Sequence, residues 1–149
     1  MLMKKLSWLL LFVPSVGSAF CFDDAGKTFN VSPHLLKSIA KVESDFDPYA
    51  YNENRNQSGK VISRDYGLMQ INSSWFGKLH AFGIDGSNVN IPCLNVMLGA
   101  WVLSSNFATH GYNWNSVGAY NAGFSKRTEN ARKIYIQKVQ RVYYSQKIK

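Results

Sequence analysis

One acidic side chain stands on the apolar side of an expected helix. Residues 32–44 begin with Ser32, a favourable N-cap, and Pro33, which fits the first helical position. The spacing i, i+3, i+4, i+7 then places on one face Leu36, Ile39, Ala40 and Glu43. Burial against hydrocarbon and the negative C-terminal end of a helix both raise the pKa of a carboxyl. Glu43 is therefore a candidate general acid near neutral pH, unless it lies at a frayed helix end and turns to water.

The first residues have the composition of an export signal. A pair of lysines is followed by an apolar run at residues 6–13 and by small residues at 17–19, where a signal peptidase cuts. The apolar run is too short to span a bilayer. We therefore expect a signal peptide at residues 1–19 and one domain at residues 20–149, located in the periplasm or secreted.

The cysteines and histidines indicate a disulfide and no metal site. Two cysteines in an exported chain usually pair, so we expect a bond between Cys21 and Cys93. It would tie the start of the domain to the start of a later helix. His34, His80 and His110 lack the spacing of metal ligands. No metal or other cofactor is expected.

The charge of the chain favours an anionic polymer as its partner. The formal net charge is +8, and it falls to +6 without the two lysines of the export signal. Outside the cytoplasm such polymers are wall glycan, anionic surface polymers and lipid headgroups. Nucleic acid is the rival partner, but the sequence has an export signal and no zinc-finger or basic-zipper pattern. We expect no nucleic-acid partner.

Helical periodicity dominates the domain. We expect an α+β fold, mainly α, with a small β element beside the helix of Glu43. The expected β element comprises a hairpin tip at 57–60 and a strand or extended loop at 65–71. The other expected helices are a short one after Cys21, one capped by Ser73 or Ser74, and three at 92–110, 116–122 and 126–144. The helix at 92–110 should be central, with one face formed by Leu94, Met97, Leu98, Trp101, Val102 and Ser105. The last helix should have on one side Ala131, Tyr135, Val139 and Val142.

Four short motifs, in this order, resemble those of the lysozyme-like lytic transglycosylases. They are Glu43-Ser44, the Gly-Leu-Met-Gln segment at 67–70, the Ala-Tyr-Asn-Ala-Gly segment at 119–123, and the segment around Tyr135. The resemblance covers residues 22–145, and four motifs in order are far more specific than any one of them. A domain of this size is similar to the specialised transglycosylases of secretion, pilus and conjugation systems.

The resemblance implies a lysozyme-like fold and a role for each motif. Glu43 would protonate the leaving glycosidic oxygen. The substrate-binding or orienting residues would be Ser44, Met69, Gln70, Tyr120, Asn121 and Tyr135. In that account Met69 and Gln70 shape the floor of the sugar site, and the hydroxyls of Tyr120 and Tyr135 orient Glu43 or bond to it. The plainer alternatives are a helix-end role for Ser44 and core roles for the two tyrosines.

Asp65 departs from the usual transglycosylase pattern. The segment from Asp65 to Ser73 resembles the part of animal c-type lysozyme that carries a second catalytic carboxylate, and Asp65 falls on that position. True c-type lysozyme has four disulfides, whereas this chain has two cysteines. Asp65 is therefore a candidate catalytic residue, and its alternative role is to cap the turn before Gly67.

Together these features predict a peptidoglycan lytic transglycosylase. It would cleave the β-1,4 bond between N-acetylmuramic acid and N-acetylglucosamine, leave 1,6-anhydro ends, and open the wall locally for an envelope-spanning apparatus. We expect a monomer that acts on glycan strands as a component of a type III or type IV secretion, pilus or conjugation machine. The alternatives are a lysozyme-type hydrolase that uses Glu43 and Asp65, and a non-catalytic glycan-binding assembly protein.

Overall fold

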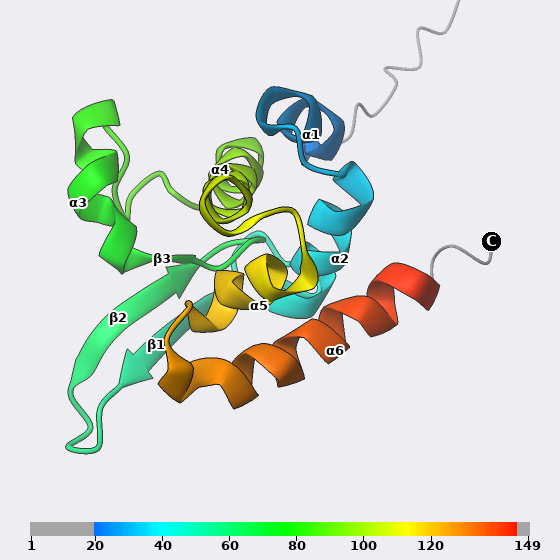
Figure 1. The fold of residues 1–149 in the computed structure, drawn as a ribbon. Coiled ribbons are helices and arrows are strands. Elements are labelled where there is room, and N and C mark those ends of the chain that lie inside the picture. Colours follow the sequence, from blue (N-terminus) through cyan, green and yellow to red (C-terminus); the bar gives the residue numbers. More distant parts are fainter. Residues whose placement is uncertain (1–19, 146–149) are drawn as a thin grey trace, which may run out of the picture.

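A frame of helices surrounds one long central helix. The computed structural model describes residues 20–145, so the signal peptide expected at 1–19 lies outside the described residues. The central helix is α4 (Pro92–His110), and the frame is formed by α1 (Phe22–Phe29), α2 (Pro33–Ser44), α5 (Trp114–Ala122) and α6 (Glu129–Ser145). Figure 1 looks along α4, with α6 running beside α2 and α5. The frame holds the core, and α2 carries Glu43 in its last turn.

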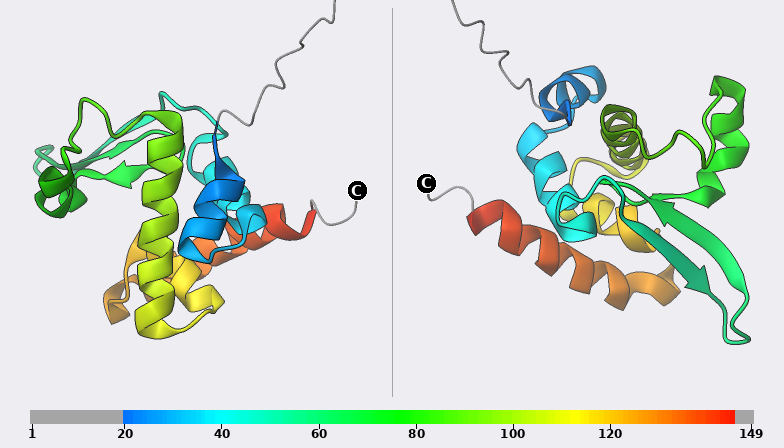
Figure 2. Two further views of the ribbon diagram at one scale, coloured as in Figure 1. Left: turned by 90° about the horizontal axis from the view of Figure 1, so that it is seen from above. Right: turned by 180° about the vertical axis from the view of Figure 1, so that it is seen from behind.

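A small antiparallel sheet extends from one side of this frame. Its order is β1-β2-β3, from β1 (Tyr51–Arg55), β2 (Val61–Tyr66) and β3 (Ile71–Asn72). Figure 2 shows the sheet and α3 (Phe76–Leu79) on the same side of α4. At the predicted hairpin tip, the side chain of Asn56 accepts hydrogen bonds from the backbone N–H groups of Ser58 and Lys60. The mainly helical α+β architecture confirms the predicted fold class.

Asparagines cap two segments for which the sequence predicted another start. Asn72 accepts a hydrogen bond from the Ser74 N–H, so the prediction that Ser73 or Ser74 is the cap was wrong. The expected single helix is broken into η1 (Ser73–Trp75), α3 and η2 (His80–Phe82). Asn113 accepts from the Ser116 N–H and starts α5 two residues earlier than predicted. Asparagine and serine are about equally good caps, so neighbouring candidates compete.

The central helix α4 is buried on several sides. Leu98 and Val102, on the predicted face, are buried, whereas Trp101 and Ser105 are half-buried. Other buried residues of α4 lie off that face, namely Asn95, Val96, Gly99, Ala100 and Leu103. A helix with neighbours on several sides has no single apolar stripe. The central position was predicted correctly, but the single face was wrong.

The buried side of α6 also differs by one residue. Tyr135 and Val139 are buried as predicted, but Ala131 is exposed and Arg132 is only 7% exposed. Residues three and four positions before Tyr135 lie on the same side of a helix, so spacing alone does not choose between them. Arg132 is preferred because its guanidinium finds hydrogen-bond acceptors there, as described below.

One covalent link joins the start of α1 to the central helix α4. The predicted disulfide between Cys21 and Cys93 is present, with an S–S distance of 2.05 Å. It connects the residue before α1 to the first turn of α4. Across the described part of the chain, residues 20–145, no helix is both long enough and apolar enough to cross a membrane.

Candidate active site

Glu43 lies at the end of α2, where the helix meets a cleft. Ser32 caps the other end of α2 by accepting a hydrogen bond from the Leu35 N–H, as the sequence predicted. Burial raises the pKa of the Glu43 carboxyl from 4.5 to about 7, and the negative charge of Asp65 acts in the same direction. A hydrogen bond from Tyr135 and the positive charge of Lys138 act in the opposite direction. The carboxyl is therefore protonated in a large fraction of molecules at neutral pH, as general acid catalysis requires.

Tyr135 contacts the acid directly. Its hydroxyl donates a 2.5 Å hydrogen bond to Oε1 of Glu43. Burial, and then the charge of Glu43, raise the pKa of Tyr135 well above its ordinary value, so the hydroxyl keeps its proton. The geometry is that expected of a residue that orients the acid.

Asp65 is held in the middle of the sheet by three amide groups. Asn54 donates to its Oδ2 at 2.8 Å and Asn72 to its Oδ1 at 2.7 Å, and Asn52 is 3.5 Å from Oδ2. Asn52 and Asn72 are also its partners in register on β1 and β3. The turn after Asp65 is closed without it, because the Gly67 N–H donates to a backbone carbonyl of the preceding loop. The carboxylate is thus fixed by neighbouring strands, which does not support the turn-capping alternative.

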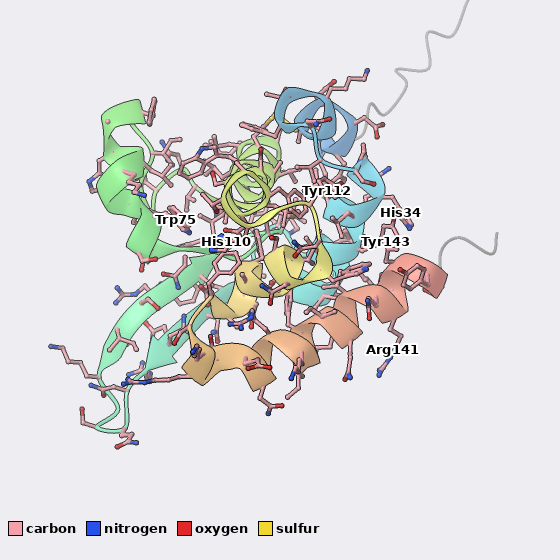
Figure 3. All side chains as sticks on the ribbon, viewed as in Figure 1. His34, Trp75, His110, Tyr112, Arg141 and Tyr143 are labelled. Carbon is pink, nitrogen blue, oxygen red and sulfur yellow. A yellow bond between two sulfur atoms is a disulfide. The ribbon has the colours of Figure 1, made fainter. Side chains whose placement is uncertain are left out.

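The two carboxylates line one continuous cleft between the sheet and α5. A hollow of about 470 Å³ is lined by Glu43, Asn54, Ser63, Asp65, Gln70, Asn72, Ser74, Trp75, Tyr120, Asn121 and Gly123. A wider hollow of about 870 Å³ continues along the loop after α2 and shares Glu43, Asp65, Gln70 and Asn121. Figure 3 shows Trp75 between the sheet and α3, and its ring lies edge-on to that of Trp101. Polar side chains with one aromatic wall are suited to binding sugars.

The predicted role of Met69 was wrong. Its side chain is fully buried, so it does not form the floor of the cleft. Instead its peptide groups are held from two helices: its N–H donates to Oδ1 of Asn95 at 2.7 Å, and its carbonyl accepts from the Tyr120 hydroxyl at 2.6 Å. The side chain packs on α4 at Gly99, where a Cβ atom would lie 2.6 Å from Cε of Met69. Met69 therefore anchors the turn from which the next residue reaches the cleft.

Ser44 and Tyr120 also hold this turn. The Ser44 hydroxyl donates to the Leu68 carbonyl at 2.9 Å, which links the end of α2 to the turn. Tyr120 donates to Met69, whereas the sequence analysis placed its hydroxyl on Glu43. Hydrogen bonds from α2, α4 and α5 thus meet on residues 68 and 69. We name this set, Ser44, Asn95 and Tyr120 with their backbone partners, the turn clamp.

Gln70 and Asn121 lie in the cleft as predicted from the motifs. Gln70 has a left-handed backbone (φ 48°), and its Nε2 donates to the carbonyls of Gly67 at 3.0 Å and Ala50 at 3.2 Å. Its amide therefore joins two loops that border the cleft. Asn121 stands at the end of α5 and lines every hollow that Glu43 lines.

Two structurally important residues were missed by the sequence analysis. Asn95 is fully buried in α4, and its Nδ2 donates to the carbonyls of Tyr66 and Val89. Arg132 donates to Oδ1 of Asn115 and to backbone carbonyls at residues 123 and 125, so it fixes the loop after α5. A signal was present for Asn95, since an amide among the apolar residues of a helix is unusual. Arg132 gave no comparable signal.

The described residues provide no cluster of metal ligands beside Glu43 and Asp65. Among residues 20–145 there is no group of three or more His, Cys, Asp or Glu side chains that could hold a metal ion. The polar groups that the cleft does present include two carboxyls, a tyrosine hydroxyl and several amides.

Comparison with known proteins identifies the family to which this fold belongs. Residues 20–142 match the model of the transglycosylase SLT domain, and the chain belongs to that family. It is accordingly a peptidoglycan lytic transglycosylase, as the sequence analysis predicted.

Curated relatives align over most of their length. Protein IpgF of Shigella sonnei is 39% identical over 136 residues, which cover 91% of this chain and 86% of the relative. Invasion protein IagB of Salmonella typhimurium is 40% identical over 135 residues, covering 89% and 79%. A peptidoglycan-binding-like protein of Escherichia coli O157:H7 is 37% identical over 147 residues, covering 89% and 88%.

A solved structure shares the fold. An inactive mutant of the lytic transglycosylase Slt from Pseudomonas aeruginosa aligns with a TM-score of 0.62 and 22% identity. The alignment covers 91% of this chain and 25% of that one, so the chain spans about a quarter of the length of Slt. At this identity the match establishes the lysozyme-like fold.

Proposed function

We propose that the enzyme cleaves the β-1,4 bond between N-acetylmuramic acid and N-acetylglucosamine and leaves 1,6-anhydro ends. The observation that carries this proposal is Glu43, a cleft carboxyl whose pKa burial raises to about 7 and whose Oε1 is bonded to Tyr135. A carboxyl with that pKa serves as acid in one step and as base in the next.

In the first step, Glu43 gives its proton to the glycosidic oxygen as the bond from that oxygen to the anomeric carbon breaks. In the second step, the 6-hydroxyl oxygen of the same muramic acid bonds to the anomeric carbon. The proton of that hydroxyl passes to the Glu43 carboxylate, which restores the acid. Since nucleophile and electrophile belong to one sugar ring, no protein nucleophile and no water are consumed.

Asp65 stabilises the positive charge that develops at the anomeric carbon between these steps. Its carboxylate lines the same hollow as Glu43, and the amides of Asn54 and Asn72 fix its orientation. A preorganised charge of this kind lowers the barrier without having to reorient during the reaction. The N-acetyl group of the substrate can share this role.

Asp65 also favours a second candidate function, hydrolysis as in lysozyme. A carboxylate facing the anomeric carbon can act as nucleophile or stabiliser while water completes the reaction. The two functions differ in their products: transglycosylation gives anhydro ends and hydrolysis gives reducing ends. A non-catalytic assembly protein would give neither.

The relatives support a setting in the cell envelope. IagB is described as an invasion protein, and another relative as peptidoglycan-binding-like. We propose that this chain is periplasmic or secreted, that residues 1–19 are its signal peptide, and that it is a monomer that acts on glycan strands. In that setting it opens the wall for a secretion, pilus or conjugation machine.

The test is a digest of purified peptidoglycan with mass spectrometry of the released ends. Wild-type protein is incubated with chelator and without cofactor, beside Glu43→Gln as the matched control. We expect anhydro-muropeptides from the wild type alone. Reducing-end muramic acid as the sole product would favour the hydrolase, and no release by folded wild type would favour the assembly protein.

A further inference from the structure

Apart from the two hollows of the sugar cleft, a smaller one opens beside Glu43, between α2 and α6. Its volume is about 270 Å³, and it is lined by Val42, Glu43, Asn121, Ala131, Ile134, Tyr135 and Lys138. Figure 1 shows α6 running beside α2, and Tyr135 joins the two helices through its bond to Glu43. Glu43 and Asn121 line both this hollow and the sugar cleft. The hollow is thus a side branch of the cleft at the reaction centre.

One wall of this branch carries the cationic side chain of Lys138. Lys138 makes no ion pair or hydrogen bond with any residue in the described range 20–145. Lys133, on the same helix, is instead paired with Glu129 at 2.7 Å. The Lys138 charge acts on Glu43, whose pKa it lowers, so it is felt at the reaction centre. The branch therefore offers positive charge to an incoming anion.

The rest of the wall is apolar and small. Ile134 is 47% exposed, a large fraction for an aliphatic side chain, and it faces the hollow with Val42 and Ala131. A ligand that matches this wall combines a small apolar group with a carboxylate. Covering these side chains would add apolar burial to the ionic contact.

We propose that the branch binds the peptide stem of the muramic acid beside the scissile bond. This inference rests on the proposed function, because that sugar must lie at Glu43. The stem is a short acidic peptide that begins with alanine and is attached to the sugar ring itself. Its alanine lies on Ile134 and Val42, and a following carboxylate pairs with Lys138. The branch makes the enzyme select strands that carry stems.

The test compares two substrates that differ in the stem alone. One is intact glycan strands, and the other is the same strands after an amidase has removed the peptides. The measured quantity is the ratio of kcat/KM for the two substrates. Because Glu43 serves both substrates, any change in its pKa cancels in this ratio.

For Lys138→Gln we expect the ratio to fall about fivefold, which corresponds to the upper end of the free energy of an exposed ion pair. The fall should come from a higher KM for the strands that carry stems. Lys138→Glu should lower the ratio further, since it repels the stem, and Ile134→Ser should lower it as well. Arg141→Gln is the matched control: Arg141 lies one turn along α6 and points away from α2 in Figure 3. It should leave the ratio at the wild-type value.

Two results would overturn the inference. The first is a wild type that cleaves both substrates equally well. The second is a ratio unchanged in both Lys138 variants, since a docked stem must respond to reversal of that charge. Failure of the proposed function would give a different result, because the wild type would then release no fragments from either substrate. That result would also overturn the inference, which rests on the proposed function.

Discussion

The Tyr135 hydroxyl reaches Oε1 of Glu43 at 2.5 Å across 92 residues of sequence. A second contact fixes the same pair of helices, since the His34 ring lies against Tyr143 and its Nε2 is 2.7 Å from the Tyr143 carbonyl. Figure 3 shows this second pair at the far end of α6. The packing of α6 against α2 therefore brings the Tyr135 hydroxyl to the Glu43 carboxyl. Its hydrogen bond stabilises the carboxylate and partly offsets the effect of burial on the pKa of Glu43.

Tyr135→Phe should move the alkaline limb of the pH–activity profile to higher pH. The hydroxyl lowers the pKa of Glu43, so its loss raises that pKa and keeps the acid protonated further into the alkaline range. We expect reduced activity with a shifted limb in kcat/KM. Tyr120→Phe is the matched control, because that hydroxyl bonds to Met69 and its loss should lower activity without moving the limb. An alkaline limb at the same pH in wild type and Tyr135→Phe would show that the Tyr135 hydroxyl does not set the pKa of Glu43.

Glu43→Gln should abolish cleavage while the fold is retained. The amide is nearly isosteric, so the lost contribution is proton transfer, about 10²- to 10⁴-fold in rate. Residual activity above about a tenth of wild type in a folded variant would show that another group is the acid.

The same variant should also be more stable than wild type at alkaline pH. Because the folded-state pKa is raised from 4.5 to about 7, the stability that Glu43 contributes is fully present below pH 4.5 and lost as pH rises through 7. Glutamine has no such dependence. The gain in free energy of unfolding at pH 8 should be at most about 3 kcal/mol, vanishing near pH 4. Urea unfolding at the two pH values measures it.

Asp65→Asn should slow cleavage substantially, but less than Glu43→Gln, and leave the anhydro product unchanged. Loss of the negative charge also lowers the pKa of Glu43, so the alkaline limb should move to lower pH, opposite to the shift in Tyr135→Phe. Asp24→Asn, at an exposed acid of α1, is the control. Activity of Asp65→Asn within about twofold of wild type would remove Asp65 from the mechanism.

Asn95→Ala should destabilise the protein by about 3 kcal/mol, because it removes three hydrogen bonds to backbone groups, two of them buried. Asn106→Ala is the comparison in the same helix, since its side chain amide donates to one carbonyl, that of Ser116. We expect about 1 kcal/mol there. Denaturant unfolding of both variants checks the difference, and equal losses would show that the turn clamp contributes little.

The sequence predicted those features that local chemistry determines. Ser32 and Pro33 mark the start of α2, and helical spacing places Glu43 on its apolar side, so both the helix and the raised pKa were predictable. The disulfide was predictable from two cysteines in a chain whose first residues have the composition of an export signal. The family motifs located the cleft residues Gln70 and Asn121.

The features that the sequence did not predict depend on contacts between distant segments. The motif containing Met69 and Gln70 gives their order, but not which of them faces the core: Met69 is fully buried, whereas Gln70, with its left-handed backbone, is half-buried. Tyr120 was assigned to Glu43 because nothing local places Met69 within its reach. Likewise Arg132 replaces Ala131 in the interior because the acceptors for its guanidinium lie in a loop that the periodicity of α6 does not describe.

The turn clamp has a consequence for the order of folding. Its three side chains contact residues 24, 26 and 51 positions away, and they come from three different helices. Such non-local contacts carry a loop-closure cost, and the turn has all three partners only when α2, α4 and α5 have packed together. We therefore expect the cleft to become competent late in folding. A chain that has not finished folding carries its acid but not its active site, so we expect it to cut only when folding is complete.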